Sequence, residues 1–312
     1  MSVARRSAAR LGAAAHLAAW RGVRLLPAGL AHGCFALAAD AAWLRRGRGV
    51  RRLEANLARA RPEADQVQLR ALSRAGMRSY LRYWCDAFRL PSWSPAQVSA
   101  TVRAEGAEPL QRAVAEGRGA VAFLGHLGNW DHLGAWGAQH VAPVTTVAER
   151  LEPAQLFDAF VDFRRRLGIT VLPLTGGGTF GALLRAVRSG GVVALLADRD
   201  LTGTGVPVRL LGEPARAAGG PAALALATGA PLHPVTCSYE RLPRGAPARW
   251  GLHLVVHPAV PVPERTAEGG RATQVAAMTQ ACVDVLSEAI REHPQDWHVL
   301  QRVFDADRRA AS

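Results

Sequence analysis

The sequence contains no lysine: all 38 basic residues are arginine, against 25 acidic residues, so the formal net charge is +13. The missing lysine, together with abundant alanine and glycine, is typical of a GC-biased genome, so the choice of arginine at any one position carries little information. The net charge itself favours an acidic partner: nucleic acid, an anionic membrane or a phosphate-rich substrate.

Cysteine is also scarce. The four cysteines are scattered and form no Cys-x-x-Cys pair: Cys34, Cys85, Cys237 and Cys282. This pattern argues against a disulfide framework and against a zinc site built from cysteine pairs. We interpret the cysteines as small apolar residues of a protein in a reducing compartment.

No apolar run near the N-terminus is long enough to span a bilayer. Residues 11–20 and 25–39 are apolar, but each falls short of the ~20 residues that a spanning helix needs. A cleaved signal peptide would fit the basic start, except that Arg21 and Arg24 follow the first segment directly. Two interpretations stay open: amphipathic helices lying in the membrane interface, or a helical layer packed on the core.

The most informative stretch runs from Val121 to His132. Its apolar part has strand length and ends at Gly125, His126 follows, and Asp131 lies where a helical pattern begins. Two residues five apart within one helix point about 140° away from each other, so His126 must precede the helix. From the loop, His126 could bend over Asp131, which would accept its Nδ1 proton and leave Nε2 as a general base.

Alternatively, His126 could be a structural histidine, and Asp131 could only stabilise the positive N-terminal end of the helix that it begins. His126, Asp131 and His132 are also potential metal ligands, but their spacing does not fit a helical zinc site, so we predict no metal. No serine or cysteine occurs between Thr101 and Thr170. The nucleophile would therefore be a hydroxyl of the substrate.

Strands and helices alternate after His126, which predicts an α/β fold: a single domain with a central, mainly parallel (mixed) sheet and helices on both faces. We divide the chain into an N-terminal helical, membrane-associating layer (1–90), the α/β core (91–305) and a tail (306–312). Active groups of such sheets lie at the carboxyl ends of strands. His126, Gly176 and Asp198 all fall at predicted strand ends.

Charged residues near these ends are further candidates. Asp198, Arg199 and Asp200 follow a nearly all-apolar segment, where charges are costly unless they are paired or solvated in a cleft. Salt bridges with neighbouring arginines are the alternative explanation for the two aspartates. Arg150 and Arg164 could hold phosphate groups, because a guanidinium binds two phosphoryl oxygens at once.

The His-(x)4-Asp pattern with Gly-Asn-Trp inside it resembles the glycerolipid acyltransferase superfamily, in the branch of the lipid A lauroyl/myristoyl acyltransferases. It is most similar to the actinobacterial phosphatidylinositol mannoside acyltransferases. Further blocks occur in the order typical of that family and extend the resemblance to Phe304: Glu149-Arg150-Leu151, Phe163-Arg164, Asp198 to Thr202, Gly212 to Arg216, and Pro294 to His298.

The resemblance implies transfer of a fatty acyl group, palmitoyl by expectation, from acyl-CoA to a mannose hydroxyl of a phosphatidylinositol mannoside, with no acyl-enzyme and no cofactor. It implies His126, Asp131 and Asp200 as catalytic residues, with Asp200 as the carboxylate that assists the histidine. The expected location is the cytoplasmic face of the plasma membrane, bound peripherally to an anionic surface. The implied substrate-binding residues are Asn129, Trp130, Glu149, Arg150, Arg164, Asp198 and Arg199.

Two alternatives remain at this point. The chain could acylate another membrane glycolipid, since the motifs do not determine the acceptor. It could also be a basic membrane- or nucleic-acid-binding protein in which His126 is structural. No recognition helix, zinc finger or paired aromatic motif accompanies the charge, so we expect no nucleic-acid partner.

Overall fold

A central sheet of seven strands organises the computed structural model, which describes residues 22–149, 154–174, 178–200, 203–264 and 270–309. The strand order is β1-β9-β8-β2-β5-β3-β4, and every neighbouring pair is parallel except β8 and β9. The predicted mainly parallel, mixed sheet is confirmed. The strands are β1 Val102–Glu105, β2 Ala120–Leu124, β3 Val144–Ala148, β4 Ile169–Pro173, β5 Val192–Leu196, β8 Leu232–Arg241 and β9 Trp250–Val256.

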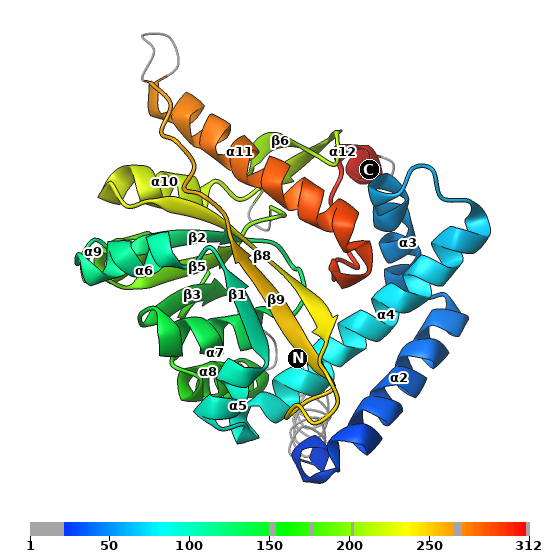
Figure 1. The fold of residues 1–312 in the computed structure, drawn as a ribbon. Coiled ribbons are helices and arrows are strands. Elements are labelled where there is room, and N and C mark those ends of the chain that lie inside the picture. The colour runs from blue at the N-terminus through cyan, green and yellow to red at the C-terminus, as the bar shows by residue number, and fades with distance from the viewer. Residues whose placement is uncertain (1–21, 150–153, 175–177, 201–202, 265–269, 310–312) are drawn as a thin grey trace, which may run out of the picture.

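Helices cover both faces of this sheet, as Figure 1 shows. One face packs against α9, α10 and α11, and the other against α5 to α8 and the end of α4. The helices are α2 Ala28–Arg45, α3 Arg48–Ala60, α4 Gln66–Arg89, α5 Pro95–Ala100, α6 Glu108–Ala115, α7 Trp130–His140, α8 Ala154–Arg166, α9 Thr179–Arg188, α10 Gly220–Thr228, α11 Gly270–Glu292 and α12 Asp305–Arg309, with 3-10 turns η1 Leu90–Ser92 and η2 Pro294–Asp296.

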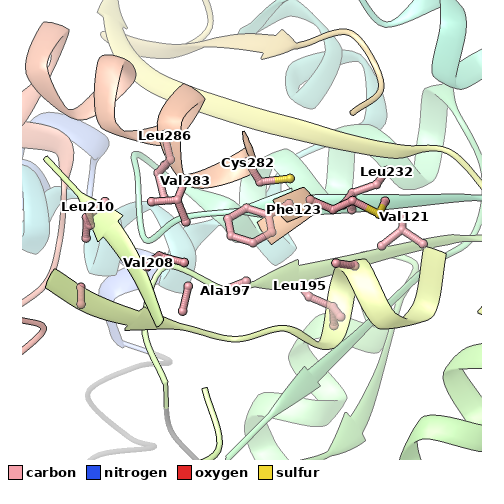
Figure 2. Close-up of a cluster of buried hydrophobic side chains, with 14 of the residues drawn as sticks. Val121, Phe123, Leu195, Ala197, Val208, Leu210, Leu232, Cys282, Val283 and Leu286 are labelled. Carbon is pink, nitrogen blue, oxygen red and sulfur yellow. The ribbon is translucent and has the colours of Figure 1, made fainter. Parts of the chain in front are cut away.

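The centre of the core lies between the sheet and α11. All five residues of β2 are buried, because both of its faces are covered, and this explains its continuous apolar sequence. Phe123 of β2 is 1% exposed and belongs to the same cluster as Val283 and Leu286 of α11 (Figure 2). This packing holds the end of β2, and the loop that follows it, in a fixed position.

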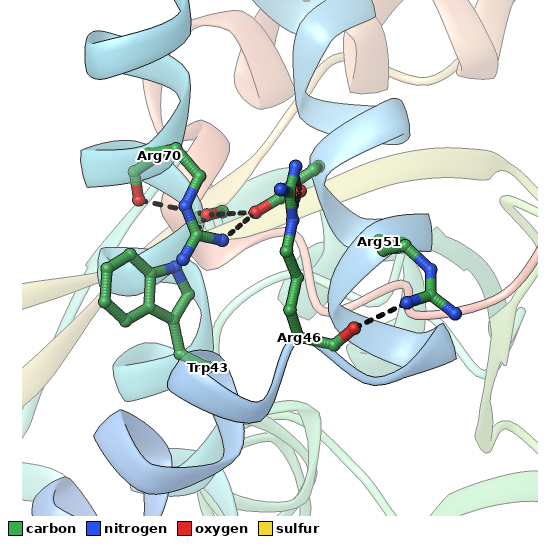
Figure 3. Close-up of polar contacts among 6 residues, drawn as sticks. Trp43, Arg46, Arg51 and Arg70 are labelled. Atoms are coloured by element: carbon green, nitrogen blue, oxygen red, sulfur yellow. Dashed lines mark hydrogen bonds and ion pairs between the residues drawn. The ribbon is translucent and has the colours of Figure 1, made fainter.

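The N-terminal layer consists of α2, α3 and α4, which lie at one end of the sheet (Figure 1). Asp65 is the N-cap of α4, and its side chain accepts a hydrogen bond from the backbone N–H of Gln68. Buried Glu54 of α3 joins the three helices, since it accepts hydrogen bonds from Arg46 and Arg70. Arg70 in turn covers the ring of Trp43 at 3.9 Å (Figure 3).

Two elements depart from the sequence prediction. No strands were predicted between residues 206 and 217, whereas β6 (Val206–Leu210) and β7 (Glu213–Ala217) form an antiparallel hairpin. The predicted tail after residue 305 is partly helical, because α12 covers Asp305–Arg309 and its Asp307 accepts a hydrogen bond from Arg59 of α3. None of the helices in the described ranges is long and apolar enough to cross a membrane.

Candidate active site

His126 and Asp198 meet because their strands are neighbours. Parallel pairing places Leu124, the last residue of β2, opposite Leu196, the last residue of β5. Both chains then continue for two residues, and the backbone N–H of Ala197 donates to the carbonyl of Leu124 at 2.8 Å. The sheet register therefore brings His126 and Asp198 together, although 72 residues separate them in the sequence.

The two side chains form a close dyad. His126 Nδ1 lies 2.6 Å from Asp198 Oδ1, and the His126 backbone N–H donates to Oδ2 at 3.0 Å. The indole Nε1 of Trp297 donates to the same Oδ2 at 3.1 Å. The His126 carbonyl accepts a hydrogen bond from the backbone N–H of His298 at 2.8 Å, so the histidine is held from both sides.

Electrostatics fix the tautomer of His126. Burial alone would raise the pKa of Asp198, but the charge and hydrogen bonds of His126, with the Trp297 donor, outweigh it and lower this pKa to about 2. The carboxylate is therefore ionised at neutral pH and can only accept hydrogen bonds. The proton of the neutral imidazole then lies on Nδ1, and the lone pair of Nε2 is available as a base.

Nε2 faces the open side of the site. The His126 side chain is 14% exposed, whereas that of Asp198 is fully buried. No hydrogen-bond partner for Nε2 occurs among the described residues. The ring of Trp130 stands edge-on to the imidazole, with centroids 5.3 Å apart, and also lines an apolar cavity of about 70 Å³ between the sheet and α7. A hydroxyl bound here would lie next to the base and beside an apolar space.

The predicted pairing of His126 with Asp131 is wrong. Asp131 Oδ1 accepts a hydrogen bond from Arg164 Nε at 2.6 Å, and its Oδ2 accepts one from the Tyr83 hydroxyl at 2.8 Å. The loop does not bend back onto its own helix, because a carboxylate from the neighbouring strand already occupies the Nδ1 side of His126. Asp131 and Arg164 instead form a buried ion pair that joins α7 to α8.

Two predicted phosphate- or substrate-binding residues are therefore engaged in internal contacts. Arg164 is held by Asp131, whose charge raises the arginine's pKa against the opposing effect of burial. Asn129 is fully buried, and its Oδ1 caps α7 by accepting from the backbone N–H of His132 at 3.0 Å. Asp198, predicted among the substrate contacts and as an arginine partner, pairs with His126.

The remaining predicted residues have these positions. Arg199 is half-buried beside the dyad, and its Nε has no hydrogen-bond partner within the described ranges. Asp200, the predicted helper carboxylate, accepts a hydrogen bond from the backbone N–H of Gly203 at 3.0 Å, while Asp198 occupies the position expected for it. Glu149 is exposed after β3, and Arg150 and Gly176 lie outside the described residues.

The metal option also loses its geometric basis, because His126, Asp131 and His132 have separate partners. His132 Nε2 lies 3.0 Å from the Thr101 hydroxyl, away from the dyad. Within the described part of the chain, the group that could hold a metal consists of His32, Cys85 and Asp86, in which His32 Nε2 already contacts Asp86 Oδ1 at 2.7 Å.

Sequence reasoning assigned no role to the segment around η2, although it quoted Pro294 to His298 as a family block. Asp296 is buried; its carboxylate accepts hydrogen bonds from the Ser79 hydroxyl and the Tyr239 backbone N–H, and its carbonyl accepts one from Gly128. Gly128 has φ +59, and a Cβ there would meet Cys237 Sγ at 2.6 Å, so only glycine fits this turn. The segment thus locks the His126 loop.

Replacing Trp297 with phenylalanine should lower kcat about tenfold with little change in KM, because it removes one hydrogen bond to a buried charged group while keeping the ring. Trp297→Phe and wild type would be compared by steady-state kinetics and by thermal unfolding. Trp43→Phe is the matched control, since it removes an indole N–H that donates to Ser73, in the N-terminal layer. An unchanged kcat in Trp297→Phe would contradict the positioning role.

Stability should fall on mild acidification because two histidines are buried in the neutral form. Burial lowers the pKa of His132 from 6.5 to about 4 and, with the charges of Arg82 and His126, that of His298 to about 3. The unfolded chain binds these protons below pH 6.5 but the folded protein does not, so the free energy of unfolding falls as the pH falls.

When the pH is lowered from 6.5 to 5, the two histidines together should reduce the free energy of unfolding by roughly 3 kcal/mol. Urea unfolding at both pH values measures this difference. His132→Gln should reduce the pH dependence by about half, whereas the same change at exposed His140 should not. Equal pH dependence in both variants and wild type would refute this origin.

Taken together, the site consists of a buried carboxylate, a histidine that this carboxylate aligns, and a neighbouring apolar cavity, all on an α/β sheet. A family model, bacterial lipid A biosynthesis acyltransferase, matches residues 2–305. The chain belongs to this family and is an acyltransferase.

Individual relatives agree with this assignment. The phosphatidylinositol mannoside acyltransferase of Mycolicibacterium smegmatis (strain ATCC 700084 / mc(2)155) is 40% identical over 296 residues, covering 94% of this chain and 91% of the relative. The protein of the same name from Mycobacterium tuberculosis (strain ATCC 25618 / H37Rv) is 40% identical over 297 residues, covering 94% and 88%. The resemblance predicted from the motifs is confirmed.

Among solved structures, the chain is similar to the 1-acyl-sn-glycerophosphate (LPA) acyltransferase PlsC from Thermotoga maritima. The TM-score is 0.37 and the sequence identity 15%, over 83% of this chain and 98% of the other.

Proposed function

We propose that this acyltransferase moves a fatty acyl group, palmitoyl by expectation, from acyl-CoA to a mannose hydroxyl of a phosphatidylinositol mono- or dimannoside. The observation that carries the proposal is the His126–Asp198 dyad with its free Nε2. The choice of acceptor is supported by the names of the relatives, which match this chain at 40% identity over 94% of its length.

In this mechanism His126 acts as a general base. Its Nε2 removes the proton of the mannose hydroxyl while the oxygen attacks the thioester carbonyl, and buried Asp198 stabilises the imidazolium that forms. Collapse of the tetrahedral intermediate breaks the carbon–sulfur bond and releases the CoA thiolate, which needs little acid assistance. Transfer is direct, without an acyl-enzyme, and binding of both substrates side by side contributes much of the rate.

In this proposal the thioester end of the acyl chain lies at the apolar cavity beside Trp130, whose volume of about 70 Å³ holds only a few of its methylene groups. Its walls come from the underside of the sheet and from α7, including Leu124, Leu133 and Val235. Gly134 and Gly137 line the same space, and a Cβ on Gly134 would meet Ile169 Cδ1 at 2.6 Å, so glycine lets α7 pack closely on the sheet. The cavity therefore lies beside His126, where the thioester carbonyl has to be.

The phosphates of acyl-CoA require cations near the mouth of the site. Arg199 fits this role, because it follows Asp198 directly and its Nε is buried without a partner among the described residues. Arg150 remains a second candidate from its sequence block. Arg164 is no longer one, since Asp131 holds it.

Helix α2 supports the proposed peripheral attachment to the cytoplasmic face of the plasma membrane. Ala31 and Ala39 are buried on its inner side, while Leu30, Leu37 and Leu44 are 54%, 72% and 70% exposed. Residues seven apart lie on one side of a helix, so these leucines form an exposed apolar stripe. A helix lying in the membrane interface would bury this stripe.

The function is tested with the purified full chain, radiolabelled palmitoyl-CoA and three acceptors in turn: a phosphatidylinositol mannoside, phosphatidylinositol and lysophosphatidic acid. We expect label in the mannoside together with equal release of CoA. Label in lysophosphatidic acid alone would overturn the choice of acceptor. Release of CoA without label in any lipid would overturn acyl transfer.

A further inference from the structure

A second pocket, separate from the one beside His126, lies between α2, α4 and the β8–β9 hairpin. Its volume is about 520 Å³. Among the residues that the structure describes, no acidic side chain lines it, and six arginines do: Arg24, Arg78, Arg82, Arg89, Arg241 and Arg249. Neither the acyl chain nor the dyad uses this space, so its charge needs another explanation.

Three of the six arginines have structural partners. Arg78 is paired with Asp40 of α2, Arg89 donates to the carbonyls of Val23 and Leu26, and Arg24 donates to the carbonyl of Phe88. These contacts hold α2 and the segment before it against α4. Arg24, Arg78 and Arg89 therefore help to form the wall of the pocket. The other three arginines are the ones available to bind an anion.

The guanidinium groups of Arg82, Arg241 and Arg249 have no hydrogen-bond or carboxylate partner among the described residues. Arg82 lies over the ring of Trp250 at 3.9 Å, and Arg241 approaches the same ring at 5.2 Å. Two cations near one aromatic ring repel each other, and an anion bound beside both would reduce this repulsion. Guanidinium groups suit a phosphate, whose oxygens accept several of their hydrogen bonds at once.

The opposite wall of the pocket belongs to α2 and is uncharged apart from His32. Its small residues Gly29, Gly33 and Ala36 give the pocket room on this side. At about 100° per residue, these three lie on the flank of α2 next to the stripe of Leu30, Leu37 and Leu44. A ligand in the pocket therefore has arginines on one side and the apolar stripe beside it.

We propose that this pocket binds the phosphate-bearing headgroup of an anionic membrane phospholipid, while the lipid's acyl chains stay in the bilayer that meets the leucine stripe. The inference rests on the proposed attachment to a membrane and gives that attachment a specific lipid contact. It concerns binding alone, so it can fail or succeed independently of acyl transfer.

The test compares Arg241→Gln/Arg249→Gln with Arg112→Gln/Arg188→Gln. Both double variants lose two positive charges, but Arg112 and Arg188 are exposed on α6 and α9, away from the pocket. Binding is measured, without acyl-CoA, to phosphatidylcholine vesicles that contain one fifth phosphatidylglycerol, at physiological ionic strength. Circular dichroism and thermal unfolding verify that each variant is folded.

Each arginine near an anionic membrane surface contributes about 1 kcal/mol to binding. Loss of two arginines that contact the headgroup should therefore weaken vesicle binding roughly 20- to 30-fold. The control variant should lose no more than about twofold, because charges beyond a Debye length of the surface are screened. Equal losses in the two double variants would overturn the proposal in favour of general electrostatic attraction.

A second arm distinguishes a lipid headgroup from a free phosphate. Glycerophosphoglycerol and inorganic phosphate are each titrated into the wild-type protein, alone and with vesicles present. A lipid site should bind these soluble probes far more weakly than vesicles, and they should not displace the protein. Tight binding of either probe, lost in Arg241→Gln/Arg249→Gln while vesicle binding stays the same, would assign the pocket to a soluble phosphorylated ligand instead.

Discussion

His126→Ala should lose about 10²- to 10⁴-fold in acyl transfer at neutral pH, because general-base catalysis by a positioned side chain contributes about this much. The loss should appear mainly in kcat, since the histidine acts on a proton that moves only in the transition state. The measurement is transfer of radiolabelled palmitate to the phosphatidylinositol mannoside, with substrate binding measured separately. The side chain is 14% exposed, so its removal should leave the fold intact.

His140→Ala is the matched control for this experiment. His140 ends α7, is exposed, and its Nε2 lies 2.6 Å from the Ser99 hydroxyl, away from the dyad. Its removal should leave transfer within a factor of two. If His126→Ala, folded by circular dichroism, transferred as fast as wild type, the general-base mechanism would be refuted.

Asp198→Asn should reduce kcat on the order of 10³-fold, because an amide cannot enforce the proton on Nδ1 as a carboxylate does. If the amide nitrogen introduced by this substitution faced His126, it would donate to Nδ1 and move the imidazole proton to Nε2, which would then lack its lone pair. In that orientation Trp297 and the His126 backbone N–H would keep their shared acceptor at the Oδ2 position. The variant is assayed like His126→Ala, across pH 6 to 9.

Variants of Asp200 and Asp131 test whether His126 pairs with Asp198 or with one of the two aspartates that the sequence suggested. Asp200→Asn should change kcat by less than tenfold, because Asp200 Oδ1 accepts its bond from the Gly203 backbone. Asp131→Asn should mainly lower stability, by about 3 kcal/mol, because it leaves Arg164 buried without its counter-charge. A large loss of kcat in Asp200→Asn with little loss in Asp198→Asn would show that the catalytic carboxylate is Asp200.

Much of the fold could be predicted from the sequence because its signals are local. The apolar segments at Val121 and Val192 indicated strands, and the alternation of elements predicted a mainly parallel sheet with helices on each side. The strand ends then placed His126 and Asp198 at one edge. That step used only the rule that parallel strands end on the same side.

The partner of His126 could not be predicted in the same way, because it depends on which strands are neighbours and in what register. Sequence spacing favoured Asp131, and family resemblance favoured Asp200. The pairing of Leu124 with Leu196 selects Asp198 instead. A shift of β5 by one residue would turn Asp198 to the other face of the sheet. The β6–β7 hairpin was missed because it has only two strands with a turn at Leu211-Gly212, next to a proline.

The contacts of Trp297 and His298 make this active site one that is completed late in biosynthesis. Trp297 binds a carboxylate 99 positions earlier in the chain, and His298 holds the backbone of a histidine that lies earlier still. A nascent chain that has already formed β2 and β5 still lacks both donors. His126 and Asp198 therefore receive their last two hydrogen bonds only after α11 and the segment that follows it have been synthesised and folded onto the sheet.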